Sequence, residues 1–234
     1  MSAGTTSGNG VPSEAFLRAV GPTIFESLRS RGRVRSFERG TVLFHESQTS
    51  EHVAILLEGT VKVTLCEDHD RDALLAIRGP GDLIGELGAV ESKPRFGTIT
   101  ALEPVEALVV PSSAFRDILA NEPSAWKAVI ELLASRLRDS DRKRAQFGTH
   151  DTGARVAARI VELGDRFGER VDERIRINLP LTQDELALWT GCSREAVAKA
   201  MQAMRELGWL ETGRRSIVIT DEDALRRRAM HPSA

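Results

Sequence analysis

The segment 85–97, "GELGAVESKPRFG", combines residue types that suit the binding of a small anion. Gly85, Glu86 and Leu87 open a tight turn, in which a glycine lets the backbone approach a ligand closely. Arg95 follows a proline, and its guanidinium can pair with the oxygens of an acidic group. The segment therefore predicts an anion-binding site.

A second group of residues, between 182 and 199, has the spacing of a helix-turn-helix. Thr182 and Glu185 form an S/T-x-x-E capping box, which predicts a helix start at 182–183. Ala187 is small enough for two helices to cross closely, and Gly191 permits the positive φ of the turn. Val197 is then expected in the core beneath the second helix.

The second helix of this motif carries groups that can recognise DNA bases. Ser193 is its predicted N-cap, and Arg194, Glu195 and Lys199 share the face that would enter a major groove. Arginine pairs with guanine O6 and N7, and glutamate accepts from cytosine N4.

A hairpin tip, "TGRRS" at 212–216, follows this motif. It places Arg214 and Arg215 on a wing suited to backbone phosphates. The alternative is an ordinary helical hairpin with a solvated charged face. We favour DNA binding, because the capping box, the turn glycine, the spacing of the core residues and the wing are all those of a winged helix-turn-helix. The predicted DNA-binding residues are Thr182, Ser193, Arg194, Glu195, Lys199, Arg214 and Arg215.

Several segments of the chain are expected to form the helices and strands that position these groups. Residues 14–30 have helical spacing, and short alternating runs from 33 to 111, separated by turn residues, predict an antiparallel sandwich or barrel. After residue 150 we expect a helix over 153–168, a strand, the two helices described above, the hairpin and a short terminal helix. Residues 1–13 are small and polar and predict a disordered tail.

The stretch 123–147 predicts one long helix. Its residues at alternating spacings of four and three resemble the seam of a two-stranded coiled coil. These residues are Trp126, Ile130, Leu133, Leu137, Ser140, Arg144 and Phe147. The alternative is a helix packed on its own domain; we favour the dimer because the spacing persists over three heptads.

The composition narrows the function. The 234 residues have a net charge of −2, contain no apolar run long enough for a membrane span, and begin without a secretion signal, so a cytoplasmic protein is expected. Two cysteines and five histidines without ligand spacing predict no metal site, and Cys66 is expected in a buried strand. No acid/base pair or triad is recognisable, so we predict that the protein is not an enzyme.

Residues 20–220 resemble the CRP/FNR family of bacterial transcription regulators. The resemblance rests on "GTVLFHE", "LLEGTVKV" and "GDLIGELG", which are similar to the β-roll repeats, and on "GCSREAVAKAM", which is similar to the recognition helix. It implies an α+β fold with an N-terminal antiparallel, jelly-roll-like β-roll, a long dimerisation helix and a C-terminal winged helix-turn-helix. The implied boundaries are 14–122 for the sensor domain, 123–148 for the dimerisation helix and 149–234 for the DNA-binding domain.

The same resemblance implies partners. These are a second copy of the chain, joined through 123–148, double-stranded DNA with a near-palindromic site and TGTGA-like half-sites, and RNA polymerase. Lys199 stands where the family has an arginine base reader, which weakens bidentate reading there.

The resemblance also implies an effector in the β-roll, with cAMP or cGMP as candidates. In the family's phosphate cassette, Gly85 allows close approach, Glu86 accepts the ribose 2′-hydroxyl and Arg95 neutralises the cyclic phosphate. Phe96 departs from the usual Ser or Thr, and Asp141 departs from a hydroxyl residue next to Ser140. Predicted ligand-binding residues are Gly85, Glu86, Leu87, Arg95, Phe96, Ser140 and Asp141. Another nucleotide, or a pocket plugged by Phe96 with constitutive DNA binding, stays open as an alternative.

Overall fold

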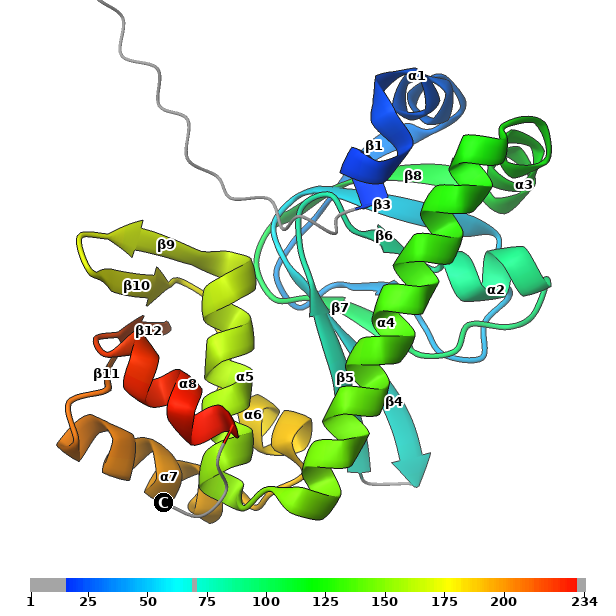
Figure 1. Ribbon diagram of the computed structural model, residues 1–234. Coiled ribbons are helices and arrows are strands. Elements are labelled where there is room, and N and C mark those ends of the chain that lie inside the picture. Colours follow the sequence, from blue (N-terminus) through cyan, green and yellow to red (C-terminus); the bar gives the residue numbers. More distant parts are fainter. Residues whose placement is uncertain (1–15, 69–70, 231–234) are drawn as a thin grey trace, which may run out of the picture.

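The computed structural model describes residues 16–68 and 71–230, which form two lobes connected by the long helix α4 (Figure 1). The predicted tail 1–13 lies outside the described residues. Within the described ranges, no helix has the length and apolar character needed to cross a membrane.

The N-terminal lobe contains two four-stranded antiparallel sheets, with strand orders β1-β8-β3-β6 and β2-β7-β4-β5. Its elements are α1 (Phe16–Arg31), β1 (Arg33–Phe37), β2 (Val42–Phe44), β3 (His52–Glu58), β4 (Val61–Asp68), β5 (Arg71–Arg78), β6 (Leu83–Ile84), α2 (Glu86–Glu91), β7 (Thr98–Ala101), β8 (Val105–Pro111) and α3 (Ser112–Asn121). The α+β class and the antiparallel β-roll predicted from the sequence are confirmed.

Strand β3 is buried on both faces because it lies between two layers. Its side chains alternate, so Val53 and Ile55 pack with the helices, whereas Ala54 and Leu56 pack with the other sheet. Helices α1, α3 and α4 therefore cover one face of the roll (Figure 1).

Helix α4 (Pro123–Thr149) has two different faces. Ala125, Val129 and Leu132 are buried against the roll. On another face Ile130 and Leu137 are 60% and 63% exposed. One face thus fixes the helix to its own lobe, and an apolar stripe is left uncovered.

The C-terminal lobe is a helical core with a small sheet of order β11-β12-β10-β9. Its elements are α5 (Thr152–Phe167), β9 (Gly168–Val171), β10 (Arg174–Ile177), α6 (Gln183–Thr190), α7 (Arg194–Glu206), β11 (Leu210–Gly213), β12 (Ser216–Ile219) and α8 (Glu222–Met230). Val156 and Ile160 of α5 and Val197 and Met201 of α7 share its core.

The two lobes also pack on each other directly. Helix α6 packs against β5, so Leu74 and Ile77 belong to the same apolar cluster as Leu186 and Trp189. The surface between the lobes is thus formed by a strand of the roll and the first helix of the helix-turn-helix.

Two details correct the sequence analysis. Cys66 lies on β4 as expected, but it is exposed, so the prediction of a buried residue was wrong. Val61 and Thr64 are the buried residues of this strand, and its pairing with β5 shifts register between Val63 and Thr64 and again between Cys66 and Asp68, so Cys66 stands on an irregular part of the strand. Strand β9, which pairs with β10, was not predicted.

Candidate functional site

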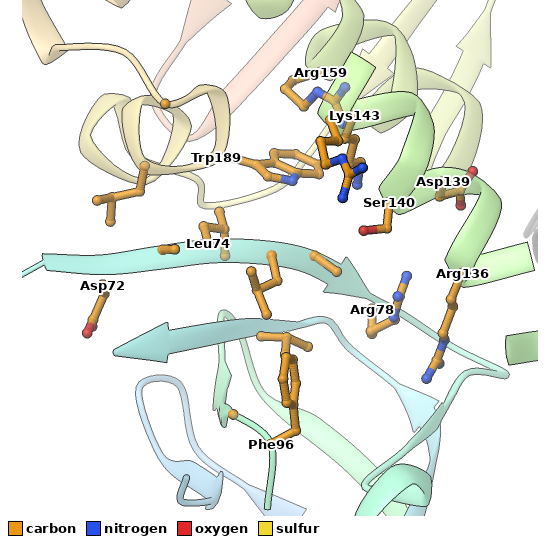
Figure 2. Close-up of a pocket in the computed structure, with 18 of the residues that line it drawn as sticks. Asp72, Leu74, Arg78, Phe96, Arg136, Asp139, Ser140, Lys143, Arg159 and Trp189 are labelled. Atoms are coloured by element: carbon orange, nitrogen blue, oxygen red, sulfur yellow. The ribbon is translucent and has the colours of Figure 1, made fainter. Parts of the chain in front are cut away.

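A cavity of about 1,320 Å³ lies between the β-roll, α4 and α6 (Figure 2). Of the predicted ligand-binding residues, six line it: Gly85, Glu86, Leu87, Arg95, Phe96 and Ser140. Asp141 is exposed on α4 and does not line the cavity. The structure thus brings the segment 85–97 together with the middle of α4, which follows it by some 40 residues.

Gly85 occupies a position that only glycine fits. Its φ is +78°, in the left-handed region, and it precedes the short helix α2. A Cβ built there would lie well inside contact distance of Arg95 Nη1 and 3.0 Å from Phe44 Cε2. The missing side chain is what lets the guanidinium lie on this turn.

Arg95 is a buried cation whose hydrogen bonds end on neutral groups. It is 7% exposed, and its Nη1 and Nη2 donate to the carbonyl oxygens of Gly85 (3.0 Å) and His52 (2.6 Å). Its Cζ lies 3.9 Å from the centre of the Phe44 ring. Burial lowers the pKa of Arg95, and among the described residues no carboxylate lies within ion-pair distance of it. An anion in the cavity would supply the missing charge.

Glu86 is joined to α4 by Arg136, a residue that the sequence analysis missed. The carboxylate is 3% exposed, and its Oε1 accepts from Arg136 Nη1 at 2.6 Å. Arg136 Nη2 donates to the carbonyl of Leu83 at 2.6 Å. A ligand group that hydrogen-bonds Glu86 therefore acts on an ion pair that ends on the long helix.

Leu87 and Phe96 stand at the margin of the cavity. Leu87 is 38% exposed and Phe96 is 58% exposed. Figure 2 shows the Phe96 ring below the strands, on the opposite side from Ser140 and Trp189. The arrangement does not match a plug.

The helix-turn-helix has the local structure that its sequence predicts. Thr182 Oγ1 accepts from the Glu185 amide (3.1 Å) while the Glu185 carboxylate accepts from the Thr182 amide (2.8 Å), which confirms the capping box. Gly191 has a φ of +62°, and Ser193 Oγ accepts from the Ala196 amide at 3.2 Å. Turn and caps therefore fix the angle between α6 and α7.

Helix α7 presents a polar face to solvent. Arg194, Glu195 and Lys199 are exposed, while Val197 and Met201 are buried on the opposite side. Hydrogen bonds from its own backbone amide and from the Ser193 hydroxyl lower the pKa of Glu195, so the side chain is an acceptor at neutral pH. Arg194 makes a loose surface pair with Asp184 (3.4 Å), which leaves it available.

The wing is the turn between β11 and β12. Arg214 and Arg215 are both exposed there, and Arg215 has a φ of +63°. Neither makes an ion pair with another described residue. All seven predicted DNA-binding residues are thus gathered in the helix-turn-helix and its wing.

Two family models match the chain. The cyclic nucleotide-binding domain matches residues 34–122, and the Crp-like helix-turn-helix domain matches residues 154–228. A CRP-like cAMP-activated global transcriptional regulator of Mycobacterium tuberculosis H37Rv is 32% identical over 214 residues, which cover 92% of this chain and 96% of that protein. The chain belongs to the CRP/FNR family of transcription regulators.

Two solved structures have the same fold. FixK2 from Bradyrhizobium japonicum matches with a TM-score of 0.76 at 20% identity, covering 87% of this chain and 99% of that one. A CRP-family transcriptional regulator from Thermus thermophilus matches with a TM-score of 0.72 at 25% identity, covering 84% of this chain and 97% of that one.

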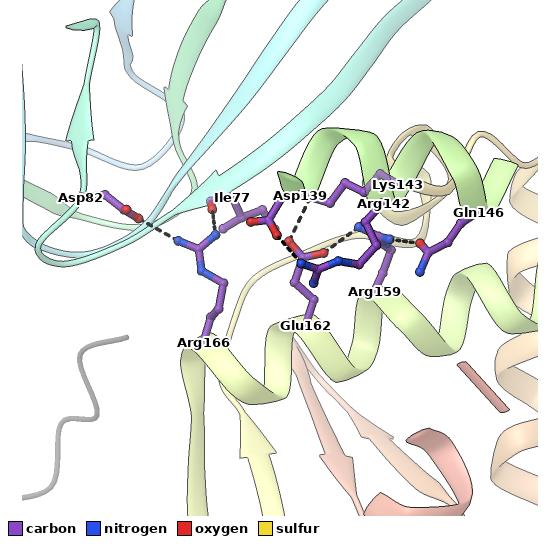
Figure 3. A network of polar contacts seen from close by, with 9 residues as sticks. All are labelled: Ile77, Asp82, Asp139, Arg142, Lys143, Gln146, Arg159, Glu162 and Arg166. Atoms are coloured by element: carbon purple, nitrogen blue, oxygen red, sulfur yellow. Dashed lines mark hydrogen bonds and ion pairs between the residues drawn. The ribbon is translucent and has the colours of Figure 1, made fainter. Parts of the chain in front are cut away.

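A polar network between the lobes of this CRP/FNR regulator escaped the sequence analysis (Figure 3). Arg166 of α5 forms an ion pair with the Asp82 carboxylate (2.8 Å) and donates a hydrogen bond to the Ile77 carbonyl (3.0 Å); both partners belong to the roll. Lys143 of α4 and Arg159 of α5 share Glu162, at 3.0 and 2.6 Å.

The basic residues of this network stabilise the ionised form of Glu162. Burial acts to raise the pKa of Glu162, but Lys143 and Arg159 outweigh it and lower that pKa. Burial lowers the pKa of Lys143. Arg166 and Asp82 are 84 positions apart, and no spacing rule connects residues so distant in the chain.

Proposed function

We propose that this CRP/FNR regulator binds palindromic DNA as a homodimer under the control of a cyclic nucleotide, with cAMP and cGMP as the first candidates. The observation that carries the effector proposal is the buried guanidinium of Arg95, which lines the cavity and has only neutral hydrogen-bond acceptors. A cyclic phosphate bears one negative charge and is small enough to sit beside Gly85.

Glu86 and Ser140 support a nucleotide as the class of ligand. Glu86 can accept a ribose hydroxyl, and the Ser140 hydroxyl on the α4 side of the cavity can meet a base. The relative from Mycobacterium tuberculosis is described as cAMP-activated, and its 32% identity over nearly the whole chain supports the same effector here.

The uncovered stripe of α4 supports the homodimer. Trp126, Ile130, Leu137 and Phe147 are 39–63% exposed, although they occupy the seam positions of the predicted coiled coil. Pairing with the same stripe of a second copy would remove this apolar surface from water.

The exposed face of α7 supports direct reading of bases. Arg194 and Glu195 lie in the first turn of the helix, where recognition helices make base contacts, and the wing arginines suit flanking phosphates. In a two-fold dimer the two α7 helices would meet half-sites about one DNA turn apart.

The position of the cavity would let a bound effector influence DNA binding. Its lining runs from Arg95 in the roll, past Arg136 and Ser140 on α4, to Trp189 on α6. A bound ligand would thus contact each part whose relative position sets the spacing of the recognition helices. The ligand changes DNA affinity only if it binds one arrangement more tightly than the other.

Titration calorimetry with cAMP and cGMP on the full-length protein tests the effector. We expect binding that is lost in Arg95→Met and kept in Arg29→Met, a control that removes a guanidinium from an exposed α1 pair. Selection of bound DNA from a random pool, with and without nucleotide, tests the DNA role. Constitutive DNA binding without nucleotide binding would contradict the effector proposal and leave the DNA role standing.

Light scattering tests the dimer. Ile130→Glu places a charge in the exposed stripe and should give monomers, whereas Glu131→Gln on the same helix should not. A monomeric wild type that still binds the full palindrome would contradict the proposed homodimer.

A further inference from the structure

We infer that Asp141 of one chain forms an ion pair with Arg136 of the second chain in the homodimer, so that each copy contributes a carboxylate to the surroundings of the other copy's Glu86. The partner that fits this surface is therefore a second copy of the same chain. The inference rests on the proposed function, because it requires two α4 helices that lie side by side and run in the same direction.

The proposed DNA role sets the relative direction of the two helices. In each chain the DNA-binding lobe follows the C-terminal end of α4. Two recognition helices can meet the two halves of one palindrome only if both lobes lie at the same end of the dimer, so the α4 helices must be parallel. In a parallel coiled coil, the g position of one helix lies next to the e position in the following heptad of its partner.

The spacing of the exposed stripe assigns Arg136 and Asp141 to these two positions. Leu137 follows Leu133 by four residues and precedes Ser140 by three, so Leu137 is an a position and Ser140 is the d position of the same heptad. Arg136 immediately precedes Leu137 and is therefore a g position. Asp141 immediately follows Ser140 and is therefore the e position of the following heptad.

The packing of α4 on the roll agrees with this assignment. Val129, the g position one heptad before Arg136, is buried against the roll. The g side of the helix therefore faces its own lobe, whereas Asp141 is exposed. In a parallel dimer the e side of the partner helix lies along this g side, so the partner's Asp141 would approach the part of the roll that Arg136 contacts.

Asp141 is available for a partner outside its own chain. Among the described residues, none forms a hydrogen bond or an ion pair with Asp141. The nearby Arg142 pairs with Asp139 instead, at 3.5 Å. A carboxylate without a partner on a helix face that borders an exposed apolar stripe is suited to an interhelical ion pair.

Arg136 has hydrogen-bonding capacity beyond its contacts in the chain. Its Nη1 donates to Glu86 and its Nη2 donates to the Leu83 carbonyl, but each of these nitrogens carries a second N–H. The side chain is 19% exposed. Figure 2 shows Arg78 next to Arg136, and the charge of Arg136 is one of the causes, after burial, that lower the pKa of Arg78 to about 9. A further carboxylate at Arg136 would therefore be favourable.

The remaining g and e positions of α4 are compatible with the same parallel pairing. Together with Arg136 and Asp141, two of the four pairs join opposite charges, and none joins like charges. The other three pairs are Glu122 with Lys127, Val129 with Ala134, and Lys143 with Gly148. Charge complementarity along the stripe thus favours a second copy of this chain as its partner.

The ion pair would connect each effector site to both helices of the dimer. Glu86, which lines the cavity, accepts from Arg136 at 2.6 Å. A ligand that binds Glu86 would change the charge balance around Arg136 and with it the attraction between Arg136 and the partner's Asp141. The pair also gives Asp141 a role, although this residue does not line the cavity of its own chain.

A double-mutant cycle on the full-length protein tests the ion pair. Sedimentation equilibrium measures the dimer dissociation constant of wild type, Arg136→Met, Asp141→Asn and the variant with both substitutions. Because two equivalent pairs form in each dimer, we expect Asp141→Asn to raise the dissociation constant about tenfold. In the Arg136→Met background the same substitution should have no effect, because the carboxylate has already lost its partner.

Two further variants and a matched control strengthen the test. Asp141→Arg places two guanidinium groups together and should weaken the dimer more than Asp141→Asn. Glu131→Gln removes a carboxylate from an exposed position of the same helix that faces away from the stripe, and should leave the dissociation constant unchanged. The two Asp141 variants decide the outcome even if Arg136→Met, which leaves Glu86 buried without its cation, is unstable.

Failure of the ion pair and failure of the proposed homodimer give different results. A wild-type dimer whose dissociation constant is unchanged in both Asp141 variants would overturn the inference and leave the homodimer standing. Equal weakening by Asp141→Asn in the presence and absence of Arg136 would overturn it as well. A monomeric wild type would contradict the homodimer of the proposed function, and the inference with it.

Discussion

Replacing Gly85 by alanine strains the backbone and displaces Arg95 at the same time. A matched substitution at Gly40 strains the backbone alone, so comparing the two variants separates the two effects. Gly85 and Gly40 have similar positive φ values, +78° and +83°. A Cβ on Gly40 would meet nothing within 4 Å, whereas a Cβ on Gly85 would collide with Arg95 Nη1. Gly40→Ala therefore reports the cost of a left-handed alanine, about 1–2 kcal/mol.

Gly85→Ala carries the same backbone cost and an additional one. To make room, the guanidinium must leave the Gly85 carbonyl, and a hydrogen bond from a charged donor is worth about 1.5–3 kcal/mol. We therefore expect Gly85→Ala to lower the free energy of unfolding by about 2.5–5 kcal/mol, against about 1–2 kcal/mol for Gly40→Ala. Urea unfolding followed by circular dichroism measures both values.

Effector binding gives the second half of this prediction. Because Arg95 is displaced in Gly85→Ala alone, nucleotide affinity measured by calorimetry should fall at least about tenfold there and stay unchanged in Gly40→Ala. Equal unfolding free energies for the two variants, or an unchanged affinity in Gly85→Ala, would refute the reasoning that links this glycine to the position of the guanidinium.

Three further predictions concern the DNA-binding lobe. Arg194→Ala should cost about 1–3 kcal/mol of DNA affinity and relax specificity at one base pair, which binding to a set of operator variants would reveal. Arg215→Ala should weaken binding to all sequences alike and reduce the salt slope by about one, measured by fluorescence anisotropy; a sequence-dependent loss would contradict a phosphate contact. Burial acts to raise the pKa of Glu185, but hydrogen bonds from Lys62 and the Thr182 amide outweigh it and hold that pKa below its usual 4.5. The stability that Glu185 contributes is therefore present above about pH 4.5 and lost as the pH falls through its lower folded value. Melting temperatures between pH 3 and 7 should fall more steeply for wild type than for Glu185→Gln, and parallel curves would contradict this.

Local signals in the sequence predicted the DNA-binding lobe well. The capping box of Thr182 and Glu185, the glycine at 191 and the cap at Ser193 each depend on residues within a few positions of one another. Such elements are determined by backbone conformation and nearby hydrogen bonds, so the sequence alone specifies them. The same holds for Gly85 and Arg95, which are ten positions apart at the two ends of the short segment that contains α2.

Details of the two sheets, such as strand register and the existence of an exposed strand, were harder to predict from the sequence. Cys66 belongs to a residue type that is commonly buried, yet it is exposed, and the register shifts of β4 at Val63/Thr64 and Cys66/Asp68 have no signature in the residue types. Strand β9 was missed because its sequence, Gly-Glu-Arg-Val, has a single large apolar residue and therefore no apolar alternation.

Most helices and strands, the recognition helix and the segment that carries Gly85 and Arg95 could be predicted from the sequence, because each is a property of a short stretch of chain. Tertiary structure decided what surrounds that turn. Leu74, Arg136 and Trp189 come from β5, α4 and α6, and only the packing of the lobes brings them to one cavity. Arg136 Nε and Trp189 Nε1 are buried donors without a hydrogen-bond partner. Burial raises the free-energy cost of such a group, and burial is a property of the assembled fold.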